Sequence, residues 1–426
     1  MLRRLTAPPF DLLAPHLPGR RAPDPAVRQE VEGILADVRA RGDAAVVEQT
    51  ARLDGAALPP AEWEIPREEW PEAFERLPPL LQGALAESTR RVRDYHDRHH
   101  DAGYRYTLLD GTQLGMRVSP VGSAAIYVAT GRTAYPSTVI MGAIPAKVAG
   151  VRQVVAVAPA GSVTDAVQAA CLLAGVDHLY QVGGAQAIGA LTYGTATIPR
   201  VDKIVGPGCR WVNEAKRQVQ GEVGIDMIAG PSEVVIIADH TAKVGHVAAD
   251  LVAQAEHDED ALAWCVTTHT PLADALPAAL EAALAKSSRA KVARTALEQR
   301  GLLVVVPDLE SACRVADLCA PEHVELLVAQ GEQWAEKIRQ AGAVLIGDST
   351  PEPVADFYAG PSHVLPTAGA SRFGSPLGVH DFIKRTSVIR YSRAALERDG
   401  PAIAAFAEAE GLKGHAEAIR VRLRES

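Results

Sequence analysis

Short runs rich in Val, Ile and Leu alternate with longer runs of helical spacing from about Val121 onward. Apolar strands joined by helices are typical of a parallel sheet covered on both faces, because each crossover lays a helix over the sheet. A first series predicts strands at 124–128, 153–157, 178–182 and 203–205, with helices at 137–148, 164–173 and 185–191. A second series predicts strands at 234–238, 263–268, 302–306 and 324–327, with helices at 244–257 and 272–286. The predicted fold class is therefore α/β, with two successive doubly wound parallel-sheet (Rossmann-like) domains.

The segments on either side of this alternation have a different character. Residues 1–120 carry helical patterns at 28–41 and 70–99 and are expected to form a mostly helical segment that packs on the α/β core. The two α/β domains are expected at 121–232 and 233–360. Residues 361–426 predict a small C-terminal helical module, with a helix end running into a strand at 382–389 and an amphipathic helix at 401–420.

Charge and cysteine content exclude several functional classes. The chain has 43 Lys and Arg against 52 Asp and Glu, so the basic surface of a nucleic-acid-binding protein is missing. No apolar stretch reaches the roughly 18 residues of a membrane span, and Pro8 and Pro9 follow the basic start too closely for a signal peptide. The 5 cysteines contain no CxxC pair. This argues against a disulfide framework and favours the cytoplasm, with any metal held by nitrogen and oxygen ligands.

Glycine-rich turns follow several of the predicted strands. They include Gly183-Gly184, Gly206-Pro207-Gly208 and Gly230-Pro231-Ser232. Parallel sheets bind ligands beyond the carboxyl ends of their strands, where such turns let the backbone approach a cofactor. None of these turns completes the GxGxxG fingerprint, so taken alone they favour ordinary strand-to-helix connections.

Polar residues end the helix predicted at 244–257. Gln254 and His257 are three residues apart and share a helix face, so an amide oxygen and an imidazole can point into one cavity. These donors suit a divalent metal completed by a carboxylate or a second histidine. The alternative, which the segment by itself favours, is a solvated acidic helix end.

Glu322 and His323 open a predicted strand. A desolvated Glu and a His that titrates near neutrality can divide acid and base work. Neighbours on a strand point to opposite faces, so an irregular strand start is required for both to serve one site. Taken alone, a Glu–His pair is more often a surface pair than a catalytic one. Asp356 and His415 carry no signal of function when each is considered in isolation.

Two further groups are interpreted as non-catalytic. His96, His99 and His100 follow a long charged helix and are predicted to form a solvated helix end. Cys209 lies at a Gly-rich turn without a local base that could generate its thiolate, so we expect no covalent role for it.

Several segments, taken together and in order, resemble the histidinol dehydrogenase family from about residue 25 to 420. The matching segments are Tyr127 with Gly131-Arg132 and Ala134-Tyr135-Pro136-Ser137, then 143–150, 183–188, 201–204, 206–208, 230–233, 254–258, 320–323, 363–367 and 410–412. The chain departs from the family pattern at Cys209, where Asn is usual, and at 129–131, where Pro-Gly-Gly is usual. Both loops are expected near NAD, so these departures affect the expected cofactor contacts.

The resemblance implies a Zn²⁺-containing, NAD-dependent enzyme that oxidises L-histidinol to L-histidine through L-histidinaldehyde, with two NAD used in turn. It also implies an intertwined homodimer in which Glu410 and His415 come from the partner subunit. The implied zinc ligands are Gln254, His257, Asp356 and His415. The implied substrate contacts are Ser232, Gln254, His257, His323, Asp356, Glu410 and His415, and the implied NAD contacts are Tyr127, Gln186 and Cys209.

Glu322 and His323 are the bases that the resemblance implies. We expect His323 to take the alcohol proton in the first oxidation and the hydrate proton in the second, while Glu322 activates the water that adds to the aldehyde. The zinc would orient the amino alcohol.

Three other functions compete with this one, among them a non-catalytic protein that binds a metal or a small molecule. A related zinc- and NAD-dependent dehydrogenase would use the same residues on another small polar alcohol. A zinc hydrolase would attack its substrate with metal-bound water and form no NADH, but the sequence has no HExxH helix. We expect no nucleic-acid or membrane partner.

Overall fold

The computed structural model describes residues 2–19, 24–55, 58–99, 101–128, 130 and 134–424. The chain divides into two units. One is Met1–Arg98 with Gly122–Phe382, and the other is His99–Val121 with Ile383–Ser426. His100 of the histidine cluster, and Ala129, Gly131 and Arg132 of the resembling segment, lie outside the described residues.

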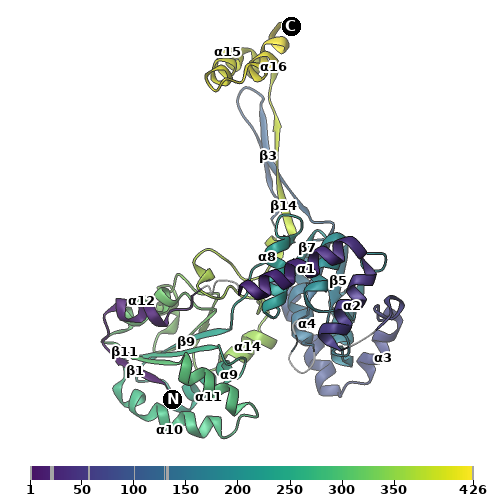
Figure 1. Ribbon diagram of the computed structural model, residues 1–426. Coiled ribbons are helices and arrows are strands. Elements are labelled where there is room, and N and C mark those ends of the chain that lie inside the picture. Colours follow the sequence, from purple (N-terminus) through teal and green to yellow (C-terminus); the bar gives the residue numbers. More distant parts are fainter. Residues whose placement is uncertain are drawn as a thin grey trace. The chain divides into compact units, whose positions relative to one another are not determined.

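The first unit contains two parallel sheets, which confirms the predicted α/β class (Figure 1). The smaller sheet has five strands in the order β6-β5-β4-β7-β8. The chain runs outward from β4 to β6 and then returns to the other side of β4 at β7, so the connections diverge between β4 and β7. Open α/β sheets bind ligands at such a point. The elements are β4 (Ser123–Tyr127), α5 (Pro136–Val148), β5 (Gln153–Val157), α6 (Asp165–Ala174), β6 (His178–Tyr180), α7 (Gly184–Tyr193), β7 (Lys203–Val205), α8 (Arg210–Val219) and β8 (Gly224–Ile225).

The larger sheet has six strands in the order β1-β11-β10-β9-β12-β13. Its connections also diverge at the first strand of the series, because β10 lies on one side of β9 and β12 on the other. The elements are β9 (Glu233–Ala238), α9 (Val244–Ala255), β10 (Leu262–Thr267), α10 (Thr270–Leu284), α11 (Ala290–Gln299), β11 (Leu302–Val305), α12 (Leu309–Cys319), β12 (His323–Leu327), α13 (Gly331–Ala335), β13 (Ala343–Ile346) and α14 (Glu352–Phe357).

The apolar runs are continuous because both faces of this sheet are buried. Val234 and Ile236 belong to one hydrophobic cluster, together with residues of α9, α10 and α11. Val235 and Ile237 belong to a second cluster, together with residues of α12. Successive residues of β9 therefore alternate between two apolar cores.

The N-terminal residues differ from the mostly helical expectation in three ways, the first being that Tyr104–Thr107 and Gln113–Pro120 are strands of the second unit. Residues Arg3–Thr6 form strand β1, which pairs in parallel with β11 at the edge of the larger sheet. The helix predicted at 70–99 is two helices, because Pro78 and Pro79 begin a new one. The helices here are α1 (Pro25–Arg41), α2 (Asp43–Asp54), α3 (Trp70–Glu75) and α4 (Pro79–His96). The predicted solvated position of His96 is wrong, since this residue is 1% exposed.

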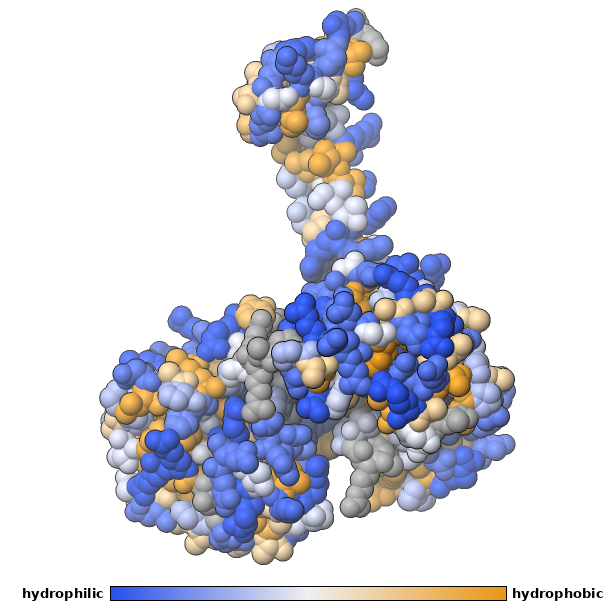
Figure 2. Space-filling view, in the orientation of Figure 1, coloured by the Kyte–Doolittle hydropathy of each residue, from blue (hydrophilic) through white to orange (hydrophobic). Residues whose placement is uncertain are grey.

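The second unit is an antiparallel sheet followed by a helix pair (Figure 1). The predicted tail helix at 401–420 is two helices that meet near Gly411, whose φ of +78° favours glycine. Figure 2 shows hydrophobic and hydrophilic side chains mixed on the visible face of this unit, and its exposed apolar residues include Tyr104, Ile389 and Phe406. The elements are β2 (Tyr104–Thr107), β3 (Gln113–Pro120), β14 (Ile383–Arg390), α15 (Arg393–Ala409) and α16 (Lys413–Arg424).

Short 3-10 helices complete the chain as η1 (Phe10–His16), η2 (Pro60–Glu62), η3 (Arg67–Glu69), η4 (Ala370–Arg372) and η5 (Val379–Phe382). Within the described ranges, no helix has both the length and the apolar character needed to cross a membrane.

Candidate active site

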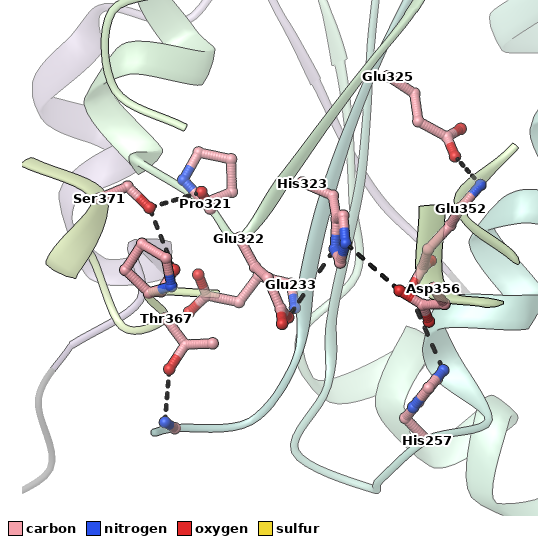
Figure 3. Close-up of polar contacts among 12 residues, drawn as sticks. Glu233, His257, Pro321, Glu322, His323, Glu325, Glu352, Asp356, Thr367 and Ser371 are labelled. Carbon is pink, nitrogen blue, oxygen red and sulfur yellow. Dashed lines mark hydrogen bonds and ion pairs between the residues drawn. The ribbon is translucent and has the colours of Figure 1, made fainter. Parts of the chain in front are cut away.

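Glu322 and His323 lie at the amino edge of the larger sheet. Helix α12 ends at Cys319 and is capped by Ala320, whose φ is +49°. Strand β12 begins only at His323, so Glu322 precedes the regular strand. This is the irregular start that the sequence required. The Glu322 Oε2 accepts a hydrogen bond from the Glu233 backbone N–H at 3.0 Å and lies 3.9 Å from His323 Nδ1 (Figure 3).

Asp356 and His257 extend this group from two other elements. The His323 Nε2 lies 3.8 Å from Asp356 Oδ1, which α14 contributes. His257, just beyond the end of α9, has its Nε2 3.9 Å from Glu352 Oε1. Figure 3 shows His323 between Glu322 and Asp356, with His257 on the far side of Asp356. Three segments, around His257, His323 and Asp356, thus meet at one edge although more than 30 residues separate each from the next.

Gln254 is in the last turn of α9 and is fully buried. Neither atom of its side-chain amide has a hydrogen-bond partner among the described residues. A buried amide without partners is costly, so such a group indicates a position that a ligand completes. Helix α9 therefore presents Gln254 and His257 at its carboxyl end, three residues apart as predicted.

Glu352 is a member of the site that sequence reasoning missed. Donor atoms of His257, Glu352 and Asp356 all lie within 4.8 Å of one another, a grouping that could hold a metal ion. Glu352 precedes Asp356 by four residues on α14, so the two carboxylates share a helix face. This spacing was the available signal, but it was invisible until a helix was recognised there.

Burial sets the protonation of these groups. It raises the pKa of Glu322 well above its usual range, and the nearby Asp356 carboxylate raises that pKa further. It also raises the pKa of Asp356 to about 7 and lowers the pKa of His323 to about 3. His323 is consequently a neutral imidazole at neutral pH, the form that accepts a proton, whereas the clustered carboxylates are costly to ionise without a cation.

The loop 367–371 lies near Glu322, on the side away from His323, and is held by several hydrogen bonds (Figure 3). Thr367 Oγ1 accepts from the Gly230 backbone N–H at 2.5 Å, and Glu233 Oε1 accepts from the Ala368 N–H at 3.0 Å. Ser371 Oγ donates to the Pro321 carbonyl at 2.9 Å. These bonds fix the peptide before Glu322 against the turn that follows Gly230.

Ser232 and His363 also belong to this region. The Ser232 side chain hydrogen-bonds Glu322, which lowers the pKa of that carboxyl. His363 is a second missed residue: burial lowers its pKa to about 4, and its charge would lower the pKa of His323. Its only sequence signal was its place in the matching segment 363–367.

Glu410 and His415 belong to the second unit. Both are exposed and line a pocket of about 560 Å³ between α15 and α16, whose other lining residues are mostly apolar. Their predicted roles at the metal and the substrate stay predictions.

Tyr127, Gln186 and Cys209 come from the carboxyl edge of the smaller sheet. Tyr127 ends β4, and its Oη accepts from the Gly184 backbone N–H at 3.0 Å. Cys209 is exposed at the start of α8. Gln186 is fully buried, and its Nε2 donates to Thr50 Oγ1 at 3.3 Å. Tyr127 and Cys209 thus lie beside the point where the connections diverge between β4 and β7.

The position of the two regions corrects one expectation. Ligands were expected beyond the carboxyl ends of the strands, which fits the region around Tyr127 in the smaller sheet. The cluster around His323 lies at the amino edge of the larger sheet instead, because it is built from strand starts and from the carboxyl end of α9.

Comparison with known proteins gives consistent results over the whole chain. Residues 19–423 match the family model described as histidinol dehydrogenase. The histidinol dehydrogenase of Dechloromonas aromatica (strain RCB) is 47% identical over 405 residues, covering 94% of each protein. That of Pseudomonas aeruginosa is 46% identical over 428 residues, covering 99% of this chain and 97% of the relative. The crystal structure of histidinol dehydrogenase from Elizabethkingia anophelis superimposes with a TM-score of 0.93 at 31% identity, covering 100% of this chain and 98% of that one.

Proposed function

This chain belongs to the histidinol dehydrogenase family and oxidises histidinol with NAD in histidine biosynthesis, and we propose that it does so at the cluster around His323. The observation that carries the proposal is the meeting of Glu322, His323, Asp356 and His257 at one sheet edge. Such a set combines proton acceptors with nitrogen and oxygen donors for a cation.

We propose a zinc site made by Gln254, His257 and Asp356, with His415 as a further ligand. Two observations support it: the unpartnered, buried amide of Gln254 and the close grouping of His257 with Asp356. Imidazole, amide and carboxylate donors are types that Zn²⁺ accepts. When bound, zinc would orient the amino alcohol and stabilise negative charge on its oxygen.

His323 serves as the general base in both oxidations. Its neutral imidazole takes the hydroxyl proton of histidinol as the carbinol carbon gives a hydride to NAD. In the second oxidation it takes a proton from the aldehyde hydrate as the hydrate carbon gives the second hydride. The low pKa that burial imposes keeps this imidazole unprotonated between turnovers.

Glu322 activates the water that adds to the aldehyde. This role requires the ionised carboxylate, which the Glu233 N–H and the Ser232 side chain both favour by hydrogen bonding. The Asp356 charge opposes ionisation, so a cation bound by Asp356 would remove part of that opposition.

The second unit supplies Glu410 and His415 to the site of a partner subunit in a homodimer. Their exposure at the end of a separate unit supports this arrangement, because exposed side chains are free to reach another chain. We also place the enzyme in the cytoplasm, which agrees with five free thiols, of which Cys209 alone is exposed.

Product stoichiometry tests the proposal. Purified protein supplied with histidinol and NAD should form two NADH for each histidine, whereas a hydrolase would form none. If other small polar alcohols are oxidised and histidinol is not, the substrate assignment is wrong.

Metal content tests the ligand set. His257→Asn should lose zinc and turnover while the protein stays folded, because one strong nitrogen donor is gone. Full zinc content in this variant would refute the placement of the metal.

A further inference from the structure

Lys216 and Asp226 form an ion pair whose side chains are both 0% exposed. A fully buried Lys is rare, because its ammonium loses all hydration, and a buried pair adds little net stability over an apolar pair of the same volume. The hydrogen bonds that such a pair makes to other groups therefore indicate its structural role. All described bonds of this pair, other than the contact between its two members, end on a single residue, Gly206.

The ion pair holds Gly206 by both of its backbone polar groups. Lys216 Nζ donates to the Gly206 carbonyl at 3.0 Å, and the Gly206 N–H donates to Asp226 Oδ2 at 2.8 Å. The direct contact between Lys216 Nζ and Asp226 Oδ1 closes the ring. Charge-assisted bonds of this kind are stronger and more directional than neutral ones.

A second side chain holds the other end of the turn. Asn213 Nδ2 donates to the Gly208 carbonyl at 2.9 Å and to the Ala229 carbonyl at 3.0 Å. Lys216 and Asn213 both lie on α8, so the helix that follows the turn also fixes it. Cys209, directly after the turn, is left exposed at the start of that helix.

The held turn lies against the proposed cofactor region. Gly206 has a φ of +109°, and a Cβ at this position would approach the Tyr127 carbonyl oxygen to 2.3 Å. The turn 206–209 follows β7 and packs on the end of β4, where the connections of the smaller sheet diverge. A shift of this turn would move Cys209 relative to Tyr127.

We propose that Lys216, Asp226 and Asn213 are positioning residues that hold the turn 206–209 in the shape that accepts NAD. The inference rests on the proposed function, since it requires NAD at this edge of the smaller sheet. None of the three residues needs to touch the cofactor. They act through the backbone of Gly206 and Gly208, and so they determine cofactor affinity and not the proton-transfer chemistry at the larger sheet.

Asp226→Asn is the primary test, because it keeps an oxygen that can accept from Gly206 and removes the charge. We expect the KM and the Kd for NAD to rise about 10-fold or more, with kcat at saturating NAD within about two-fold of wild type. The KM for histidinol and the zinc content should stay unchanged. A merely structural pair would lower the melting temperature without separating KM for NAD from KM for histidinol.

The Lys147–Asp177 pair, whose side chains are 20% and 28% exposed, provides a less buried control in the same sheet. Lys147 Nζ lies 2.6 Å from Asp177 Oδ2, which also accepts from the Val154 N–H at 2.7 Å. This pair lies at the amino ends of β5 and β6, opposite to the turn. Asp177→Asn should leave KM for NAD within about two-fold of wild type.

Two further variants keep the inference testable if a buried substitution impairs folding. Asn213→Ala removes the second clamp without leaving a buried charge and should also raise KM for NAD alone. In Lys216→Met combined with Asp226→Asn, KM should rise no further than in the worse single variant, because the pair acts as a unit.

The inference is overturned if Asp226→Asn and Asn213→Ala both fold and bind NAD as tightly as wild type. It is also overturned if Asp177→Asn weakens NAD binding equally. Failure of the proposed function is a separate result, because wild-type protein would then neither bind nor reduce NAD.

Discussion

His323 is a buried imidazole between two carboxyl groups, with Nδ1 3.9 Å from Glu322 Oε2 and Nε2 3.8 Å from Asp356 Oδ1. Burial lowers the pKa of this histidine to about 3, against a hydrogen bond with the Glu233 backbone that raises it. The same low-polarity surroundings raise the pKa of Glu322. Residue chemistry at this site is therefore determined by burial first and by charge second.

Substituting each base should separate the two oxidations. His323→Asn should lower turnover of both histidinol and histidinaldehyde by about 10²- to 10⁴-fold, because it removes the proton acceptor of both steps. Glu322→Gln should slow histidinaldehyde oxidation more than histidinol oxidation, because only the oxidation of the aldehyde requires water. Assays with each substrate, with zinc content as the control, check this. An equal loss in both steps for Glu322→Gln would contradict the assigned role.

The buried carboxyl group of Glu233 should make the free energy of unfolding depend on pH. Burial raises its pKa to about 7, from a usual value of 4.5. The native state therefore holds a proton that the unfolded state releases, so the contribution of this group to stability is complete below about pH 4.5 and is lost as pH rises to about 7.

Glu233→Gln should remove this pH dependence, since the amide does not titrate and its oxygen can still accept from Ala368. Relative to wild type, the variant should gain on the order of 2–3 kcal/mol in unfolding free energy between pH 4.5 and pH 8. Urea denaturation at the two pH values measures the difference. A constant difference between the proteins would show that Glu233 ionises normally.

At the scale of elements, α9 explains why the site lies at the amino edge of the larger sheet. The helix starts after β9 at the carboxyl edge and returns across the sheet to begin β10. Its last turn, with Gln254, and the following His257 therefore reach the edge where β12 begins. Crossover topology alone brings these side chains to Glu322 and His323.

The turn between β7 and α8 depends on glycine. Gly206→Ala places a Cβ against the Tyr127 carbonyl and also imposes a left-handed φ on a residue with a side chain. Gly221→Ala is the control, because Gly221 has a similar φ of +107° and nothing within 4 Å of its Cβ position.

Left-handed backbone strain should cost about 1–2 kcal/mol in each variant. The clash should add about 1–3 kcal/mol for Gly206→Ala only, with a rise in KM for NAD. Denaturant unfolding compares the two variants, and equal destabilisation would mean that the turn relaxes away from Tyr127.

At the scale of the whole molecule, the candidate ligands are divided between two units. Gln254, His257 and Asp356 belong to the unit with the parallel sheets, and His415 belongs to the unit made by β2, β3, β14, α15 and α16. If two copies of the chain share each site, two different inactive variants can complement one another, which they cannot do if each site lies within one chain.

Mixing two inactive variants tests the shared site. After refolding together, His257→Asn and His415→Asn should recover about a quarter of wild-type activity, because half of the dimers are mixed and each mixed dimer has one intact site. Each variant refolded alone should stay inactive. No recovery in the mixture, with mixed dimers detected by mass spectrometry, would show that both ligands come from one chain.

Local patterns in the sequence predicted the central strands of both parallel sheets and several helices, because apolar periodicity and glycine or proline breaks act over a few residues, but they did not predict the strands β1, β2, β3, β8 and β13. The family resemblance rested on short motifs of the same kind. Only the tertiary structure decided that Glu352 and His363 join the site, that the site lies at the amino edge, and that Lys216 and Asp226 close on Gly206. These contacts exist only once the sheets and helices have packed, because even the short-range ones, such as those of Lys216 and Asp226 with Gly206, join residues of different elements.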